Sequence, residues 1–542
     1  MDDFSLNTAL RQWTDLLGPD QVITGKPSLE AAERGTFWTG HSIPAIIRPA
    51  SRNEVQDCLR IANRWRVPVY PISSGRNWGY GSRMPSESGC VLLDLGRMDR
   101  IVDFDEGLGY VTVEPGVTQA QLYAFLKERG SKLWMDATGA SVHCSLIGNT
   151  MERGFGHTPY GDHFAHSCAL EVVLPDGSAI ETGFGRYEAA HAAPVYRWGV
   201  GPSLDGLFSQ SNFGIVTRMT IWLMPEPEYF QAYYFRCEEA AGISALVDAL
   251  RPLRMNGTIR SASHIANDYK VLGALQQYPW EATGGATPLL APAMAQIRQA
   301  LKFGAWNGSG ALYGTRAQVK EARRILRQAL KGRVTRLQFL DDRKLLLAST
   351  FSKLYEWCSG WNLSRTLSVL KPVYGLMKGI PTDRPLASTY WRKRTVPPAD
   401  MNPDRDQCGL LWCSPVAPIE GAHAQRIAEL TTDLILRHGF EPMISMTLLT
   451  ERTLSCIISI GYDLEIPGED ARAKACCHEL LQRLGESGYY SYRLGIGNMS
   501  AMQDSGPYSE LLQDLKQTLD PNGILAPGRY VSNPRKASAT AK

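Results

Sequence analysis

The sequence has no paired cysteine motif. Its 11 cysteines are an odd number, and none stands in CxxC spacing. We therefore expect reduced thiols in a cytoplasmic protein rather than a disulfide framework or a cysteine-ligated zinc site. His163 and His166 form an HxxH pair next to Asp162, but no third ligand accompanies them at the spacing of a zinc enzyme. We expect no metal site.

The chain also has no excess of charge and no long hydrophobic run. There are 57 Lys and Arg against 54 Asp and Glu, a net charge of +3, which excludes strong attraction to nucleic acid. No segment has the length and apolarity of a membrane span, and the first residues lack the pattern of a secretory signal. The one local cluster, basic residues from Arg316 to Arg336, fits either a solvated helix face or a docking patch for an acidic partner.

What is present is an alternation of strand-like and helix-like segments that predicts an α+β fold. Between Ala45 and Thr220, short β-branched runs alternate with amphipathic segments, and 44% hydrophobic residues suffice for a large core. Pro225 and Pro227 cannot donate to a sheet ladder, so we place a domain boundary there. We expect a first domain at 1–227, a second α+β domain at 228–490, and a final segment, 491–542, that returns to the first.

The strongest local signal is the glycine-rich segment PISSGRNWGYG, Pro71 to Gly81, which follows the strand-like VPVY. Glycines allow consecutive backbone amides to converge on an anion, and short polar side chains add donors. The segment is not a nicotinamide-binding turn, since no helix follows directly, and it lacks the lysine of a P-loop. It predicts a pyrophosphate-binding loop, with a ligand-free surface loop as the alternative.

A second glycine-rich stretch, Ala137 to Phe164, contains five glycines interleaved with polar residues. Two such loops favour a long ligand with several polar groups. A nucleotide cofactor has this character, because both its pyrophosphate and its heterocycle require close backbone approach.

Five segments together resemble one family. PISSGRNWGYG, VEPGV, GNTMERGFGHTPYGDHF, GPSLDGLFSQSNFGIVTRMTIWLMPEP and DPNGILAPGR occur in the order found in the vanillyl-alcohol oxidase and p-cresol methylhydroxylase flavoproteins. The resemblance covers nearly the whole chain. It implies a p-cresol-methylhydroxylase-type FAD-binding domain of two subdomains, made from both chain ends, with an α+β cap inserted between them.

The resemblance also implies which residues bind FAD. The first loop would hold the pyrophosphate, VEPGV and the turn from Gly214 to Val216 would lie along the adenine side, and the second loop would run beside the ribityl chain and the flavin ring. The implied residues are Ile72, Ser73, Ser74, Gly75, Arg76, Asn77, Gly79, Pro115, Gly116, Ser141, Cys144, Gly148, Asn149, Gly154, Gly156, Gly161, Ile215 and Arg529.

For the substrate, the resemblance implies a site for a phenol. Tyr80, Tyr492 and Arg493 match the two tyrosines and the arginine that bind the phenolic oxygen, and Arg529 matches a cation next to the reduced flavin. Hydride leaves the benzylic carbon of a 4-alkylphenol readily from the phenolate, which gives a quinone methide. An arginine and two hydroxyls lower the pKa of the phenol and stabilise this charge.

The chain departs from the family at the covalent flavin link. The histidine that carries the link in some members is replaced by Leu410, which excludes that bond. In the region of the tyrosine-linked members, Thr389 is aligned and Tyr390 stands one residue away. Cys144 lies where some bicovalent flavoproteins carry a linked cysteine. Tyr390, Cys144 and a dissociable FAD therefore stay open.

The proton-handling residues differ as well. The stretch ATGASVH has no aspartate, so His143 or His157 is the candidate proton carrier, and His157 fits a hydrogen-bonded wall residue equally well. Arg452 and Thr453 replace a histidine pair of the relatives. We expect the added cation to favour a substrate with a carboxylate or other acidic group.

These observations predict an FAD-dependent oxidoreductase that takes a hydride from the benzylic carbon of a para-substituted phenol. The alternatives are an FAD enzyme for a non-phenolic alcohol, amine or biosynthetic intermediate, and a non-catalytic flavin-binding subunit. We expect a small aromatic substrate, oxygen or a cytochrome-like protein as electron acceptor, and a homodimer, with no nucleic-acid or membrane partner.

Overall fold

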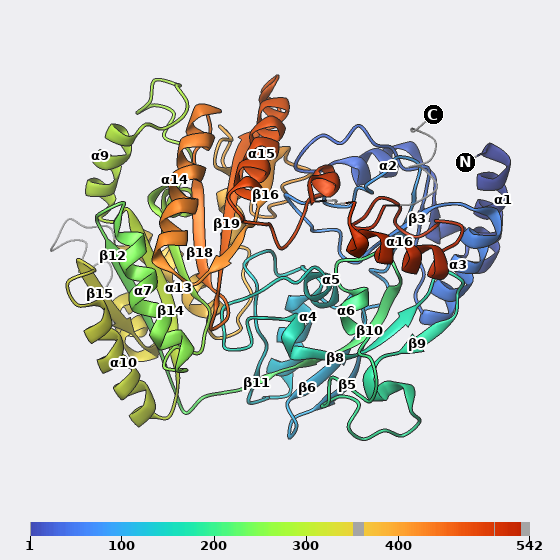
Figure 1. The fold of residues 1–542 in the computed structure, drawn as a ribbon, viewed down its shortest axis with the longest axis horizontal. Helices are drawn as coiled ribbons and strands as arrows, with labels where there is room; N and C mark the ends of the chain where they lie inside the picture. Colours follow the sequence, from blue (N-terminus) through green and yellow to red (C-terminus); the bar gives the residue numbers. More distant parts are fainter. Residues whose placement is uncertain (1, 351–362, 503–504, 533–542) are drawn as a thin grey trace.

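The computed structural model describes residues 2–350, 363–502 and 505–532. Its strands form two small sheets and a two-stranded ribbon in the first half and one large sheet in the second (Figure 1). The first sheet has the order β1 (Val22–Ile23), β2 (Ile46–Ile47), β4 (Val91–Asp94), β3 (Val69–Ile72). The second has the order β5 (Ile101–Asp105), β6 (Tyr110–Val113), β10 (Ile215–Trp222), β8 (Ser167–Val173), β9 (Ala179–Glu181). The ribbon pairs β11 (Met224–Pro225) with β7 (Leu133–Trp134).

Helices pack against these small sheets. Serine or threonine caps begin three of the helices. Ser51 Oγ accepts from the amide of Glu54 at the start of α3, Thr118 forms a capping box at the start of α4, and Ser145 caps α5. The helices of this half are α1 (Asp3–Leu17), α2 (Lys26–Glu33), α3 (Arg52–Trp65), α4 (Gln119–Glu128), α5 (Leu146–Met151) and α6 (Asp205–Phe208).

The second half of the chain builds an eight-stranded sheet, one face of which is covered by four long helices, and we call this part the cap. Its central order is β15 (Arg336–Leu340), β12 (Tyr229–Cys237), β14 (Trp306–Gly314), β13 (Ser263–Asn267), β18 (Met443–Leu448), β19 (Thr453–Asp463), β16 (Cys408–Cys413), and β17 (Val416–Pro418) pairs with β19. The cap helices are α7 (Gly242–Met255), α8 (Asp268–Leu275), α9 (Ala291–Leu301), α10 (Arg316–Leu330), α11 (Asp342–Thr350), α13 (Leu363–Leu376), α14 (Gly421–Arg437) and α15 (Glu469–Glu486). The expected boundary at Pro225 to Pro227 falls between β11 and β12.

Alternation along the cap strands gives the sheet two different faces. In β16, Leu411 and Cys413 belong to the core under the helices, whereas Leu410 and Trp412 point the other way and line a cavity. In β18, Ile444 and Met446 lie in the core, and the alternate side chains, Ser445 and Thr447, line the same cavity. One face of the cap sheet is therefore structural and the other is available to a ligand.

The chain end returns to the first half. Leu525 forms a parallel bridge with Val69 at the edge of β3, and Ile524 and Leu525 belong to its core. The last helix, α16 (Pro507–Leu519), carries the buried Lys516, whose ammonium donates to the backbone oxygen of Asn212 at 2.7 Å. Figure 1 shows this red segment beside the blue and teal elements.

Candidate active site

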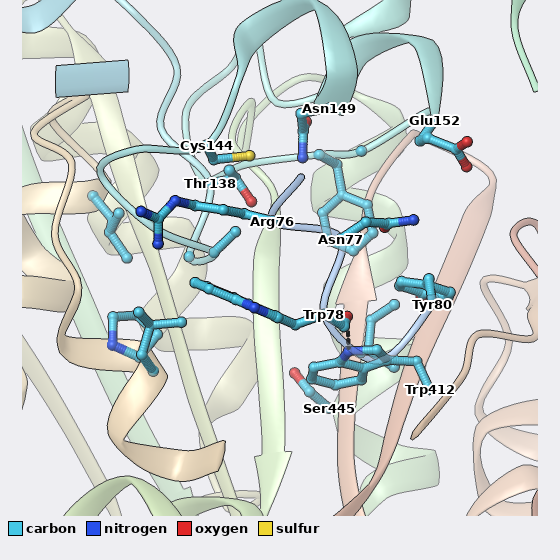
Figure 2. A pocket seen from close by; sticks show the side chains of 18 of the residues that line it. Arg76, Asn77, Trp78, Tyr80, Thr138, Cys144, Asn149, Glu152, Trp412 and Ser445 are labelled. Atoms are coloured by element: carbon cyan, nitrogen blue, oxygen red, sulfur yellow. Dashed lines mark hydrogen bonds between the residues drawn. The ribbon is translucent and has the colours of Figure 1, made fainter. Parts of the chain in front are cut away.

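A cavity of about 850 Å³ lies between the glycine-rich loops of the first half and the open face of the cap sheet. Figure 2 shows its labelled side chains, with Cys144, Thr138 and Arg76 on one side and Tyr80, Trp412 and Ser445 on the other. Both parts of the chain therefore contribute to one site.

The first glycine-rich loop follows β3 directly, and the segment from Ile72 to Asn77 lines the cavity. Gly75 and Gly79 have φ values of +66° and +76°, which L side chains adopt only with strain. Gly79 does not line the cavity. A Cβ on it would lie 2.0 Å from the Trp412 ring, so this glycine allows the loop to pack directly against the cap.

The second loop meets the first at Gly148. A Cβ there would lie 2.5 Å from Ser73 Oγ, so glycine lets the two loops touch. Ser145 precedes α5 and accepts from the Gly148 amide at 2.9 Å, which fixes the turn. Cys144, Gly148, Asn149 and Gly154 line the cavity.

Other predicted cofactor residues divide into wall and support. Pro115, Ile215 and Arg529 line the cavity. The supporting residues contact other protein groups. At three glycines there is no room for a side chain, because an added Cβ would lie 2.6 Å from Gly96 O (at Gly116), 1.5 Å from Asp136 Oδ2 (at Gly156) or 3.0 Å from Thr158 O (at Gly161). Ser141 Oγ donates a hydrogen bond to Asp383 Oδ1 at 2.9 Å.

The cavity wall fits a ligand rich in hydrogen-bond acceptors. Arg529 Nη1 and Ser211 Oγ are buried and have no hydrogen-bond partner within the protein, although both residues line the cavity. Buried polar atoms in native proteins are normally satisfied, so these two atoms favour a bound polar group here. Together with the two loops, these donors fit the pyrophosphate and ring oxygens of FAD.

Three residues predicted to bind a phenol come together, although more than half of the chain lies between Tyr80 and the adjacent pair Tyr492 and Arg493. Tyr80, Tyr492 and Arg493 all line the cavity. The Arg493 guanidinium lies 4.3 Å from the centroid of the Tyr80 ring, and the Tyr80 hydroxyl is 2.7 Å from Ser414 Oγ. Burial raises the pKa of both tyrosines, so their hydroxyls stay neutral and can donate.

Glu152 is a site residue that the sequence reasoning missed. Its carboxylate accepts from Arg529 Nη2 at 2.6 Å and from the Tyr530 hydroxyl at 2.7 Å, and it lies 3.2 Å from Arg493 Nε. Burial alone would raise the pKa of Glu152, but Arg529 and Arg493 outweigh it and hold the pKa at about 2. The available signal was a lone acid inside the glycine-rich segment GNTMERGFG.

The two histidines predicted as proton carriers lie in different places. His157 lines the cavity, whereas His143 is exposed and does not. His157 Nδ1 lies 3.1 Å from Ala137 O, and burial lowers its pKa. The cap adds His264, which sequence reasoning missed; its ring centroid lies 4.5 Å from that of His157, and burial lowers its pKa further. A neutral histidine pair thus forms across the interface of the two halves.

Two expected groups lie away from the cavity. Tyr390 does not line it, and its hydroxyl donates to Asp406 Oδ2 at 2.5 Å, so the geometry argues against a tyrosyl flavin link. Arg452 is exposed and does not line the cavity either, so it adds no cation to the site. Leu410 does line the cavity and presents an apolar side chain where a histidyl link would begin.

Cys144 remains at the cavity wall, and its environment leads to a prediction. Burial raises the pKa of its thiol to about 11, which disfavours the thiolate that would attack a flavin. We expect acid precipitation of the purified protein to release all FAD into the supernatant, from wild type and from Cys144→Ser alike. Flavin that stays with the precipitated wild-type chain but not with the variant would contradict this.

Groups of three or more His, Cys, Asp or Glu side chains that could hold a metal ion are absent from the described ranges. The ten cysteines within those ranges are buried and free of disulfides. Within the described residues, no helix combines the length and the apolarity needed to span a bilayer.

Comparison with known proteins assigns this architecture to a class. A family model described as an FAD binding domain matches residues 43–183, so the first half is that of a flavoprotein. The chain is 43% identical to 1'-carboxy-chondrochloren decarboxylase of Chondromyces crocatus, over 98% of each chain. It is 32% identical to the flavoprotein subunit of 4-cresol dehydrogenase (hydroxylating) of Pseudomonas putida, over 96% of this chain and 95% of that one.

Solved structures agree with these relatives. Substrate-bound p-cresol methylhydroxylase matches with a TM-score of 0.89 at 30% identity, over 99% of this chain and 98% of that one. The 4-ethylphenol oxidase of Gulosibacter chungangensis also has a TM-score of 0.89, at 28% identity over 99% of both chains. The chain belongs to the p-cresol methylhydroxylase family of flavoproteins and is an FAD-dependent oxidoreductase, which confirms the predicted α+β fold class and cofactor.

Proposed function

We propose that this enzyme removes a hydride from the benzylic carbon of a para-substituted phenol. The observation that carries the proposal is the cluster of the buried Tyr80 with the half-buried Tyr492 and Arg493 in the wall of the cavity. A phenolic oxygen placed among them receives two neutral hydroxyl donors and a cation. Burial alone disfavours a charged phenolate, but the cation and the two hydroxyl donors stabilise it and so lower the pKa of the bound phenol.

The phenolate is what makes the benzylic hydrogen reactive. Its electrons move through the ring as the hydride leaves, and the product is a quinone methide. Bound FAD would supply the acceptor for this two-electron oxidation. Arg529 would hold a fixed positive charge at the flavin, and Glu152 restrains both Arg529 and Arg493 so that their side chains keep one geometry.

His157 is the proposed proton acceptor for the step after oxidation. Its Nδ1 faces the backbone oxygen of Ala137, so this nitrogen carries the proton and leaves Nε2 as an acceptor. The lowered pKa of His157 keeps the ring neutral at neutral pH. Water adding to the quinone methide, or a proton leaving the side chain, would find a base there.

We expect His157→Gln to lower the rate of product formation by about 100-fold, the usual contribution of a general base. Because burial lowers the pKa of His157, the wild-type rate should fall only as the pH drops below the ordinary histidine range, and the variant should lack this step. Stopped-flow pH profiles measure both effects. His143→Gln, at an exposed position outside the cavity, is the matched control and should behave as wild type. A His157→Gln profile identical to wild type would contradict the assignment.

An anaerobic titration tests the function itself. The purified holoenzyme is mixed with 4-alkylphenols and with their O-methyl ethers, and loss of flavin absorbance is followed. Bleaching by the phenols alone supports phenolate-assisted oxidation. Bleaching by the ethers as well would favour an enzyme for non-phenolic substrates, and bleaching by neither series would contradict the proposal.

The electron acceptor and assembly belong to the same proposal. We expect oxygen or a cytochrome-like protein to reoxidise the flavin and the enzyme to be a homodimer. Admitting air to the bleached sample tests oxygen directly, and light scattering gives the oligomeric state. The basic face of α10 fits an acidic protein acceptor but is equally typical of a solvated helix.

A second candidate function is oxidation coupled to loss of CO₂, favoured by the 43% identity to a protein named as a decarboxylase. A carboxylate on the carbon next to the benzylic position can leave once the quinone methide has formed. The C–C bond to the carboxylate breaks, its electron pair forms the side-chain double bond, and the ring regains its phenolate. The sum is substrate plus FAD giving a 4-hydroxystyryl product, CO₂ and reduced FAD.

A further inference from the structure

Lys270 is a cavity-lining cation that neither the sequence motifs nor the phenol site uses. It lies in the first turn of α8, where Asn267 Oδ1 caps the helix by accepting from the Lys270 amide at 3.0 Å. On the helix, Tyr269 and Leu272 pack into a cap core. The neighbouring face, which carries Lys270 and Ala274, lines the cavity. The helix therefore fixes this ammonium group at the wall of the active site.

The ammonium group lacks a counterion. It donates a hydrogen bond to Ser459 Oγ at 3.3 Å, and among the described residues no carboxylate lies within ion-pair distance of it. Arg493 and Arg529 differ, because both pair with Glu152. Burial lowers the pKa of Lys270 to about 8, so it stays mostly protonated at neutral pH. A half-buried cation without a counterion is costly, and an anionic ligand would relieve this cost.

Trp412 connects Lys270 with the phenol site. Its ring stacks with that of Tyr80 at a centroid distance of 6.5 Å, and the Lys270 ammonium lies 5.0 Å from the Trp412 centroid. The Trp412 ring is held by a hydrogen bond from Nε1 to Trp78 O at 3.0 Å, visible in Figure 2. A phenol bound at Tyr80 can therefore extend its para side chain along Trp412 towards Lys270.

We propose that Lys270 binds a carboxylate on the para side chain, so that the substrates are 4-hydroxyphenyl compounds with a carboxylated side chain. This inference rests on the proposed phenol oxidation for the orientation of the substrate. Lys270 would act in binding and would select the charged side chain over a neutral one. It would also hold the carboxylate near the carbon from which CO₂ leaves in the decarboxylating candidate.

The test compares two compounds that differ by one negative charge. Binding of 3-(4-hydroxyphenyl)propanoate and of 4-propylphenol to the holoenzyme is measured by anaerobic calorimetry, and bleaching rates are measured with the same pair. Lys270→Met is expected to weaken binding of the propanoate by about 10- to 100-fold, the value of a charge-assisted contact, and that of 4-propylphenol by less than about threefold. Lys270→Arg keeps the charge and should keep most of the preference.

Lys320→Met is the matched control, since Lys320 is exposed on α10 and does not line the cavity. It should leave both affinities unchanged. Equal losses for both substrates in Lys270→Met, or no loss for either, would overturn the proposal. If no phenol bleaches the wild-type flavin, the proposed phenol oxidation is wrong, whatever the role of Lys270. In that case, binding of the propanoate that depends on Lys270 would still support the anion site. Absence of such binding would overturn the anion site as well.

Discussion

Replacing Arg493 with glutamine is expected to lower kcat/KM for a 4-alkylphenol by about 1000-fold at neutral pH, comparable to removing a principal oxyanion donor. The arginine lies half-buried at the cavity wall, against the Tyr80 ring. Without it the bound phenol loses the cation that we propose stabilises its ionised form, and Tyr80 and Tyr492 offer only neutral donors. The pKa of the bound phenol should therefore rise, and the benzylic hydrogen should become much less reactive.

The pH dependence distinguishes this explanation from simple misfolding. If Arg493 acts by lowering the pKa of the phenol, the variant should recover activity as the pH approaches the phenol's own pKa, whereas wild type should be active well below it. Flavin content and thermal stability are measured in parallel. Arg452→Gln removes the same charge at an exposed position outside the cavity and should change nothing. A loss below tenfold with an unshifted pH profile would contradict the role of Arg493.

The site residues that the sequence predicted correctly are those that lie in short, specific sequence motifs. Tyr80 and the Tyr492–Arg493 pair stand in recognisable motifs, and the structure brings them to one cavity although β3 and the chain end are far apart in sequence. The glycine-rich loops were readable because a backbone that touches another loop or a ring needs glycine, as at Gly79 and Gly148.

The remaining site residues depend on packing that no local pattern records. Lys270 and His264 lie on cap elements without a motif. His264 points into the cavity because of its place in the side-chain alternation of β13, and Lys270 because of the face of α8 on which it lies. His143 and Arg452 were chosen by position in the chain, but both side chains are exposed. Glu152 was visible in a motif, but its importance comes from two arginines that approach from the other end of the chain.

Replacing Glu152 with glutamine is expected to destabilise the holoenzyme by about 3 kcal/mol at pH 7. Two buried guanidinium groups would lose their shared carboxylate, and the amide can neutralise neither of them. The loss also has a defined pH dependence. The pKa of Glu152 is about 2 in the folded protein against an ordinary value of 4.5, so its contribution is complete above pH 4.5 and disappears as the pH falls towards 2.

Urea titrations of wild type and Glu152→Gln at several pH values measure this dependence. The gap in unfolding free energy should be widest at neutral pH and should close below pH 4.5, because the wild type alone must take up a proton at this site on unfolding. Glu188→Gln, at an exposed carboxylate, is the control and should show no gap. A constant gap at all pH values would mean that glutamine disturbs packing, and that the charge of Glu152 does not hold Arg493 and Arg529 in place.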